Sequence, residues 1–322
     1  MATPPDGVFV PVPTFFKTAP DAGQLQPAVD VATQAAHSVH LAKSGITGLV
    51  LLGSTGEAVH MSGEERKSLI SGVRRGLDDA GFPDYPIMAG VLVNSVDETL
   101  EWLHQSKDAG AQWGLVLAPG YFGAAASQDN LVEWFTLVAD KSPLPILIYN
   151  YPGVTNNLVV SIKTYETLAA HPNIVGCKMS HGNVSHHVQV SLHPKIDHTK
   201  FRVYSGFGQQ LGPIVLFNAG GVIDGLAAIF PKTISRLFSL ASKRPVDEST
   251  LEEVRRLQWK VSACEEYIVS NGILGIREGI YKVLGFGHLE GGRLPLKGKM
   301  AAGVYEQWSD IFGQMTEEEK KL

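Results

Sequence analysis

Short apolar runs alternate with longer amphipathic segments along the first 243 residues of the chain. The runs are rich in Val, Ile and Leu and cover residues 7–13, 46–52, 85–93, 113–119, 145–150, 173–178, 201–206 and 221–228. Runs of this length and composition are typical of strands buried on both faces, as in a parallel sheet. The pattern therefore predicts eight parallel strands.

Several of the intervening segments carry apolar residues at three- and four-residue steps, which predicts helices at 27–44, 62–77, 95–109 and 128–141. Segments 62–77 and 95–109 each open with a serine followed three residues later by a glutamate, the spacing of a capping box. Eight strands alternating with helices over about 240 residues predict a (β/α)8 TIM barrel. A doubly wound open sheet is the alternative, but the first run continues into PTFFKTAPDAG, which is no Gly-rich phosphate loop.

The last part of the chain has a wholly helical pattern. Helices are expected at 247–270, 272–284 and 297–315, and the final EEEKKL is expected to fray. We therefore predict two parts: residues 1–243 form the barrel with the active site, and residues 244–322 form a C-terminal helical region.

The composition narrows the class of protein. The 322 residues carry a formal net charge of -5, and 44% of them are hydrophobic, which is ordinary for a globular enzyme. No Lys/Arg cluster offers a nucleic-acid surface, and no apolar run approaches the roughly 20 residues of a membrane helix. With two cysteines, Cys177 and Cys264, a disulfide framework is not expected. The N-terminus resembles neither a signal nor an Arg-rich transit peptide, so a cytoplasmic location is predicted.

Lys178 is the most informative candidate for catalysis. It closes the apolar run that precedes it, and catalytic groups of TIM barrels come from the C-terminal ends of strands. An ammonium held against an apolar wall loses solvation, which lowers its pKa and leaves free amine that can form an imine with a carbonyl. From position alone, the favoured interpretation is that Lys178 extends past the strand end and its amine reaches solvent.

Two neighbouring features add to Lys178. Tyr149 ends the preceding apolar run, and its phenol could relay protons, although a core tyrosine satisfied locally is an equal alternative. The turn Gly53-Ser54-Thr55-Gly56-Glu57 follows the second run. Its glycines let the backbone approach a ligand, and the hydroxyls and amides of Ser54 and Thr55 can bind a carboxylate, with help from the N-terminus of the next helix. Glu57 is more often structural than catalytic at such a position.

Histidines crowd one stretch after Lys178. They are His181, His186, His187, His193 and His198. Their spacing is not that of a metal-ligand set, so a solvated face is the favoured explanation, and we predict neither a metal nor a cofactor.

Four motifs appear in order along the chain: GSTGE at 53–57, YNYPG at 149–153, VGCK at 175–178 and GGVIDGLAAIFP at 220–231. Together they resemble the dihydrodipicolinate synthase/N-acetylneuraminate lyase family of pyruvate-handling class I aldolases, over about residues 7 to 300. The late stretch GILGIREGIYKVLGF, followed by GGRLPL, is also similar to that family. The resemblance implies a TIM barrel and a Schiff base between a lysine and pyruvate.

The resemblance also implies roles for individual residues. Lys178 falls on the Schiff-base lysine and Tyr149 on the tyrosine that relays protons. Ser54 and Thr55 fall on the hydroxyl pair that binds the pyruvate carboxylate and joins the relay. Thr55 is therefore expected to be catalytic. Gly53, Ser54 and Thr55 are all expected to bind the substrate.

Two further positions follow from the resemblance. Ile223 falls where the family packs an apolar side chain near pyruvate. Tyr121 falls on a tyrosine that, in synthase members, crosses into a neighbouring subunit's site. The loop GYFGAAAS looks longer here, so Tyr121 acts either in its own subunit or in a neighbour's. A homodimer or homotetramer is the implied assembly.

One departure concerns the second substrate. Synthases usually carry an arginine after the tyrosine motif that grips a carboxylate, and this chain has Val154 there. MSHGNV after Lys178 also differs from the usual acidic continuation. The chain is therefore expected to be a lyase that cleaves a 2-keto-3-deoxy sugar acid or 4-hydroxy-2-oxoglutarate to pyruvate and an aldehyde. The alternatives are dihydrodipicolinate synthase, which condenses pyruvate with aspartate semialdehyde, and a catalytically silent member that binds a metabolite.

Overall fold

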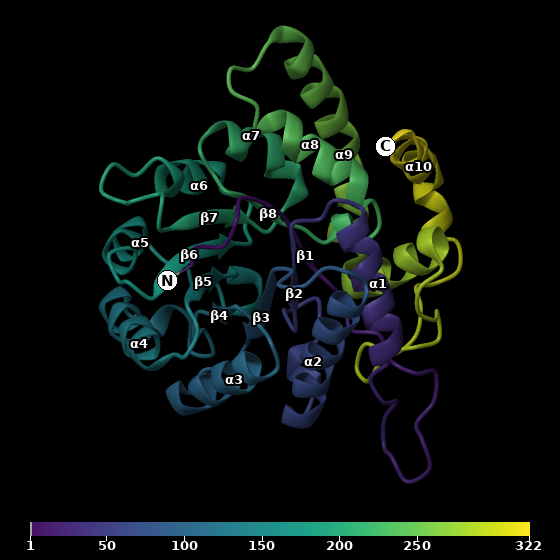
Figure 1. Cartoon of the computed structure of the whole chain (residues 1–322), viewed down its shortest axis with the longest axis horizontal. Coiled ribbons are helices and arrows are strands. Elements are labelled where there is room, and N and C mark those ends of the chain that lie inside the picture. Colours follow the sequence, from purple (N-terminus) through teal and green to yellow (C-terminus); the bar gives the residue numbers. More distant parts are fainter. Residues whose placement is uncertain (1) are drawn as a thin grey trace.

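The computed structural model describes residues 2–322, and its strands form one closed parallel barrel in sequential order (Figure 1). The strands are β1 (Gly7–Pro11), β2 (Gly48–Leu51), β3 (Ile87–Val91), β4 (Trp113–Leu117), β5 (Ile146–Asn150), β6 (Ile174–Met179), β7 (Arg202–Ser205) and β8 (Gly221–Ile223). The barrel closes where β1 pairs with β8, from Gly7 opposite Gly221 to Phe9 opposite Ile223. The predicted TIM barrel is confirmed, and the open doubly wound sheet is wrong.

A ring of helices surrounds the barrel (Figure 1). They are α1 (Val31–Lys43), α2 (Gly63–Asp79), α3 (Val96–Asp108), α4 (Gln128–Lys141), α5 (Ile162–Leu168), α6 (Val184–Ser191), α7 (Leu211–Leu216) and α8 (Pro231–Ala241). Short 3-10 turns follow five of the strands: η1 (Ala58–His60), η2 (Gly123–Ala125), η3 (Pro152–Val154), η4 (Gly208–Gln210) and η5 (Leu226–Ala228).

The helix starts obey local hydrogen-bonding rules. Ser62 accepts a hydrogen bond from the Glu65 amide at 3.3 Å, and the Glu65 carboxylate accepts one from the Ser62 amide at 3.0 Å, so the predicted capping box of α2 is confirmed. Ser95 caps α3 by accepting from the Glu98 amide at 3.5 Å. These caps satisfy amides that the first helical turn leaves without partners.

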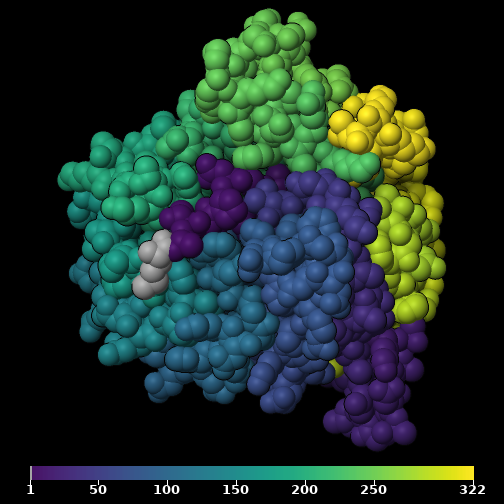
Figure 2. Space-filling model, viewed as in Figure 1, coloured from purple at the N-terminus to yellow at the C-terminus, as the bar shows by residue number. Residues whose placement is uncertain are grey.

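Two apolar layers hold the barrel. The larger layer lies between the strands and the helices. The smaller one fills the barrel and consists of Phe9, Val50, Met88, Trp113, Leu115, Leu147, Tyr149, Val175, Tyr204 and Ile223. Residues near the N-terminus lie across one end, where Trp113 donates to the carbonyl of Ala2 at 2.8 Å and Tyr204 to that of Pro5 at 2.8 Å (Figure 2).

The C-terminal region contains α9 (Glu248–Leu284), η6 (Tyr305–Trp308) and α10 (Ser309–Lys321). Gly272 interrupts α9 with a φ of 54°, at the boundary that the sequence pattern predicts. The predicted C-terminal helix is present, but it begins at Ser309 instead of 297, and it continues to Lys321 where the sequence predicts a frayed tail. Gly298 and Gly303 take positive φ, at 106° and 82°, which a helix does not tolerate. The tail continues α10, where Glu318 pairs with Lys260 and Arg256 at 2.9 Å.

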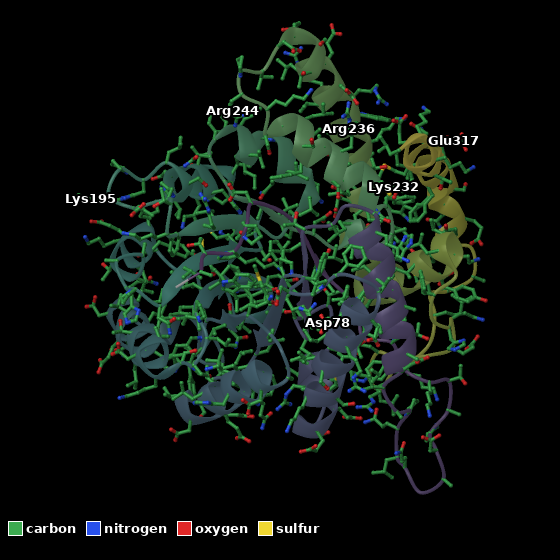
Figure 3. The ribbon with its side chains drawn as sticks, viewed as in Figure 1. Asp78, Lys195, Lys232, Arg236, Arg244 and Glu317 are labelled. Carbon is green, nitrogen blue, oxygen red and sulfur yellow. The ribbon has the colours of Figure 1, made fainter. Side chains whose placement is uncertain are left out.

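The charged side chains labelled in Figure 3 are exposed or half-buried; they are Asp78, Lys195, Lys232, Arg236, Arg244 and Glu317. Arg236 of α8 pairs with Glu253 of α9 at 3.0 Å and ties the two helices together. Among the helices of the described chain, we find none that is both long and apolar enough to span a bilayer.

Candidate active site

Lys178 lies inside the barrel, near the C-terminal end of β6. Strand pairing places it between Tyr149 of β5 and Tyr204 of β7. The side chain is 5% exposed and lines a cavity of about 670 Å³. Loss of solvation lowers the pKa of Lys178 to about 7, and the negative charge of Asp224 opposes part of that shift. The amine is therefore buried beside a cavity, in contrast to the solvent-reaching lysine that position alone favours.

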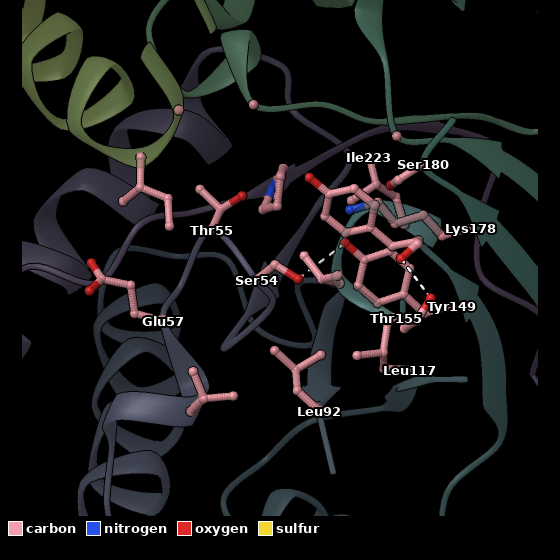
Figure 4. Close-up of a pocket in the computed structure, with 18 of the residues that line it drawn as sticks. Ser54, Thr55, Glu57, Leu92, Leu117, Tyr149, Thr155, Lys178, Ser180 and Ile223 are labelled. Atoms are coloured by element: carbon pink, nitrogen blue, oxygen red, sulfur yellow. Dashed lines mark hydrogen bonds between the residues drawn. The ribbon is translucent and has the colours of Figure 1, made fainter. Parts of the chain in front are cut away.

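Tyr149 is the closest aromatic partner of this amine. The Lys178 Nζ lies 4.6 Å from the centre of the Tyr149 ring, and the Tyr149 hydroxyl lies 3.3 Å from the Ser54 Oγ (Figure 4). Burial raises the pKa of Tyr149 to about 12, and hydrogen bonds with Ser54 and Ser180 work against that rise. The ring stacks on Tyr151 with centroids 5.9 Å apart. The phenol thus sits in a hydroxyl chain that can carry a proton to the cavity.

The turn after β2 brings Ser54 and Thr55 to the cavity wall, with Gly53 buried behind them. It is Ser54, and not Thr55, that is hydrogen-bonded to Tyr149. The turn precedes α2, as the sequence predicts, but η1 lies between them and α2 begins at Gly63. An anion at this turn would be held by the turn's own hydroxyls and amides.

Glu57 ends the same turn in the left-handed conformation, with a φ of 54°. Its buried carboxylate lies 3.2 Å from the His60 Nδ1 and 3.8 Å from the Arg277 Nη1. Burial raises the pKa of Glu57, and the charge of Arg277 counteracts the effect. Figure 4 places Glu57 on the far side of the pocket from Lys178. The geometry agrees with the structural role that the sequence favours for this acid.

Ile223 lies deep in the cavity, and Tyr121 lies at its rim. Ile223 ends β8 and is buried in the barrel interior beside the pocket. Tyr121 lies at the rim with its side chain 73% exposed and packs edge-on against Phe122, with ring centroids 5.2 Å apart. Val154, at the end of η3, also lines the rim and is 50% exposed.

The sequence analysis missed three polar residues of this region. Ser180 follows Lys178 by two positions, so the two-residue period of a strand could have pointed to it. Asp224 directly follows Ile223, and Glu265 lies on α9; both are buried, and Glu265 lines the cavity. An acid inside the apolar stretch after β8 was a signal for Asp224, but Glu265 looks like any other acid of a long helix.

Three of the five histidines, His181, His186 and His187, form a packed group instead of the solvated face that the sequence favours. The rings of His181 and His186 stack with centroids 5.0 Å apart, and His187 lies 4.7 Å from His181. His186 and His187 are buried because α6 turns them toward the barrel, where the His187 ring nitrogens lie 2.9 Å from the Asn183 carbonyl and 3.2 Å from that of Met179. Within residues 2–322, no three His, Cys, Asp or Glu side chains are grouped to hold a metal ion.

Comparison with known proteins matches the chain to the model of the dihydrodipicolinate synthetase family over residues 8–297. A protein of Emericella nidulans named as a probable mitochondrial 4-hydroxy-2-oxoglutarate aldolase is 33% identical, over 87% of this chain and 86% of the relative. The L-threo-3-deoxy-hexylosonate aldolase of Hypocrea jecorina is 32% identical, over 92% of each.

Solved structures agree with these sequence matches. A dihydrodipicolinate synthase family protein from Coccidioides immitis superposes with a TM-score of 0.83 at 29% identity, over 99% of this chain and 98% of the other. The dihydrodipicolinate synthase of Acinetobacter baumannii, solved with pyruvate, gives a TM-score of 0.82 at 26% identity, over 97% and 99%. The similarity therefore extends over the barrel and the helices that follow it.

Proposed function

Because the chain belongs to the dihydrodipicolinate synthetase family, we propose that it is a class I aldolase, a carbon–carbon lyase that cleaves a 2-keto-3-deoxy acid to pyruvate and an aldehyde. One observation carries the proposal: the buried Lys178 amine lies over the ring of Tyr149, whose hydroxyl is hydrogen-bonded to Ser54. The names of the relatives, which include aldolases for 4-hydroxy-2-oxoglutarate and for a 3-deoxy-hexylosonate, support the same class of reaction.

The first step is imine formation. A pKa of about 7 leaves a large fraction of Lys178 as free amine near neutrality. The amine adds to the C2 carbonyl of the substrate, the carbonyl oxygen leaves as water after protonation, and a protonated imine remains. We assign the delivery and removal of these protons to Tyr149, and its 3.3 Å contact with the Ser54 hydroxyl supports a relay through Ser54.

The second step breaks the bond between C3 and C4. Tyr149, which has given its proton to the departing water in the first step, removes the proton of the C4 hydroxyl; the aldehyde departs, and the electron pair of the broken bond moves into the protonated imine to give an enamine. Protonation at C3 and hydrolysis then release pyruvate and restore Lys178. Since the reverse sequence uses the same groups, the site is equally suited to condensation.

The substrate carboxylate beside the imine is assigned to the turn after β2. Thr55 lines the cavity without a bond to Tyr149, so we propose carboxylate binding as its main role and place Ser54 in the proton relay. Gly53 allows the close backbone approach, and Ile223 packs against the methyl side of the bound pyruvate unit.

A cleavage assay tests the proposal. A panel of 2-keto-3-deoxy acids and 4-hydroxy-2-oxoglutarate is offered to the purified protein, and pyruvate release is measured. We expect turnover of at least one member and none by Lys178→Met, with the exposed Lys163→Met as matched control. Aspartate semialdehyde with pyruvate tests synthase activity, which we expect to be weak because Val154 offers no cation. Binding of pyruvate without cleavage of any panel member would favour a silent family member instead.

We also propose a homodimer or homotetramer in the cytoplasm. The exposed pair Tyr121 and Phe122 at the pocket rim supports burial against a neighbouring subunit. Light scattering tests the assembly. One relative is named as mitochondrial, so the location of this protein is to be tested by cell fractionation.

A further inference from the structure

The pocket is poor in positive charge. Of the described residues that line it, Lys178 is the one lysine or arginine. The ionisable groups around the rest of the cavity are the carboxyls Glu57 and Glu265, the imidazole of His60 and three tyrosines. Beyond the imine-forming end, the wall therefore offers acids, amides, hydroxyls and apolar groups.

Glu265 belongs to a buried pair of acids. Its partner is Asp224: both carboxyls face Gly208, where a Cβ would lie 2.5 Å from the Glu265 Oε1 and 3.1 Å from the Asp224 Oδ1. Asp224 also accepts from the Ala227 amide at 3.2 Å. Burial raises the pKa of both acids, and the neighbouring Asp224 raises that of Glu265 further. Two carboxyls buried side by side disfavour a double negative charge.

Two basic side chains near the pocket, Arg277 and His60, contact the carboxylate of Glu57. Arg277 follows the lining residue Ile276 on α9, but it lines a separate small cavity, and its Nη1 lies 3.8 Å from Glu57. His60 is hydrogen-bonded to the same carboxylate at 3.2 Å. Glu57 thus contacts both groups, and Arg277 presents no unmatched positive charge to a ligand.

The charges around the cavity bear on whether the aldehyde half of the substrate carries a second carboxylate or only hydroxyls. The substrate's first carboxylate lies at the turn of Ser54 and Thr55, in the function proposed above. A second carboxylate in the aldehyde half would find no lysine or arginine in the lining beyond Lys178, and an unpaired buried charge is unfavourable. Hydroxyls, by contrast, find donors and acceptors in Glu265, Gln209 and Asn94, which line the cavity at different points.

We propose that the aldehyde half of the substrate is an uncharged polyhydroxy chain, so that a 2-keto-3-deoxy sugar acid with one carboxylate is preferred over dicarboxylates such as 4-hydroxy-2-oxoglutarate. The proposal rests on the aldolase function and selects between the substrate classes that the relatives' names leave open. In this proposal, Glu265 contacts a hydroxyl of the substrate.

The test compares the two classes on the wild-type protein. Pyruvate release is measured with a 2-keto-3-deoxy hexonate and with 4-hydroxy-2-oxoglutarate at the same pH and ionic strength. We expect kcat/KM to be about tenfold or more higher for the hexonate. Equal values, or a higher value for 4-hydroxy-2-oxoglutarate, would overturn the inference.

A charge-insertion variant makes the test specific. Val154→Arg places a cation at the pocket rim, and Val159→Arg, at a 44% exposed position outside the lining, is the matched control. Val154→Arg should lower KM for the dicarboxylate several-fold, and Val159→Arg should leave the ratio of the two substrates unchanged. A stable Val154→Arg protein with an unchanged ratio also contradicts the inference. Trapping of pyruvate on Lys178 tests the aldolase function separately from the substrate preference. If the protein forms the adduct but prefers the dicarboxylate, the proposed function stands and only this inference is overturned.

Discussion

The Tyr149 hydroxyl lies 3.3 Å from the Ser54 hydroxyl, although 95 residues separate them in the chain. The barrel brings them together because β2 and β5 deliver their C-terminal ends to one mouth. In this position the buried phenol has a polar partner beside the cavity, as a proton relay requires.

Replacement of Tyr149 tests that relay. Tyr149→Phe keeps the ring packing but removes the proton carrier, so kcat should fall by about 100- to 10,000-fold while KM changes little. Tyr165→Phe, another fully buried tyrosine, is the control and should stay within a few-fold of wild type. Steady-state kinetics of pyruvate release supply both values. Near-normal kcat in Tyr149→Phe would remove Tyr149 from the mechanism.

Asp224 should set the pH at which the lysine becomes reactive. Its negative charge raises the pKa of Lys178, which desolvation holds at about 7. In Asp224→Asn the pKa should fall further, so the rate of imine formation with pyruvate should reach its plateau at a lower pH than in the wild type. The measurement is the pH profile of borohydride-trapped adduct. A midpoint that moves upward would show that Asp224 does not act on Lys178 electrostatically.

Lys178 should also make the protein less stable at low pH. Its pKa drops from the usual 10.5 to about 7 on folding, so the unfolded chain binds more protons between these values and stability rises with pH across that window. Below pH 7 the burial penalty is fully present. Lys178→Met should therefore exceed the wild type in stability by a few kcal/mol near pH 6, and the gap should close toward pH 10. Urea unfolding at several pH values provides the test, and a pH-independent gap would contradict it.

The capping box of α2 offers a prediction on stability alone. Ser62→Ala removes the acceptor of the Glu65 amide and should cost about 1 kcal/mol in the free energy of unfolding. Because Ser62 lies outside the cavity lining, kcat/KM should remain at the wild-type value. Ser71→Ala, on the exposed side of the same helix, controls for the loss of a hydroxyl. A loss of activity in Ser62→Ala at unchanged stability would refute this assignment.

The barrel was predictable because its signals are local. Each apolar run has the length of a strand, and Ser62 with Glu65 marks a helix start within four residues. The site was predictable in part, since Lys178 and Tyr149 both end apolar runs. Their burial and mutual distance depend on strand pairing between β5 and β6, which no local pattern specifies.

What the sequence missed depends on tertiary packing. Asp224 and Glu265 are 41 positions apart, and only the return of α9 over the barrel mouth brings them together. The histidines of α6 are buried for a similar reason: the helix face that packs inward carries them. Gly298 and Gly303 were visible in the sequence, but the positive φ that delays α10 appears only in the structure.

Trapping of the imine tests the central claim most directly. The protein is incubated with pyruvate, reduced with borohydride and digested, and the peptides are analysed by mass spectrometry. We predict one reduced pyruvate adduct, on Lys178, which is lost in Lys178→Met and retained in Lys163→Met. No adduct, or an adduct on another lysine, would contradict the assignment of Lys178 as the imine-forming residue.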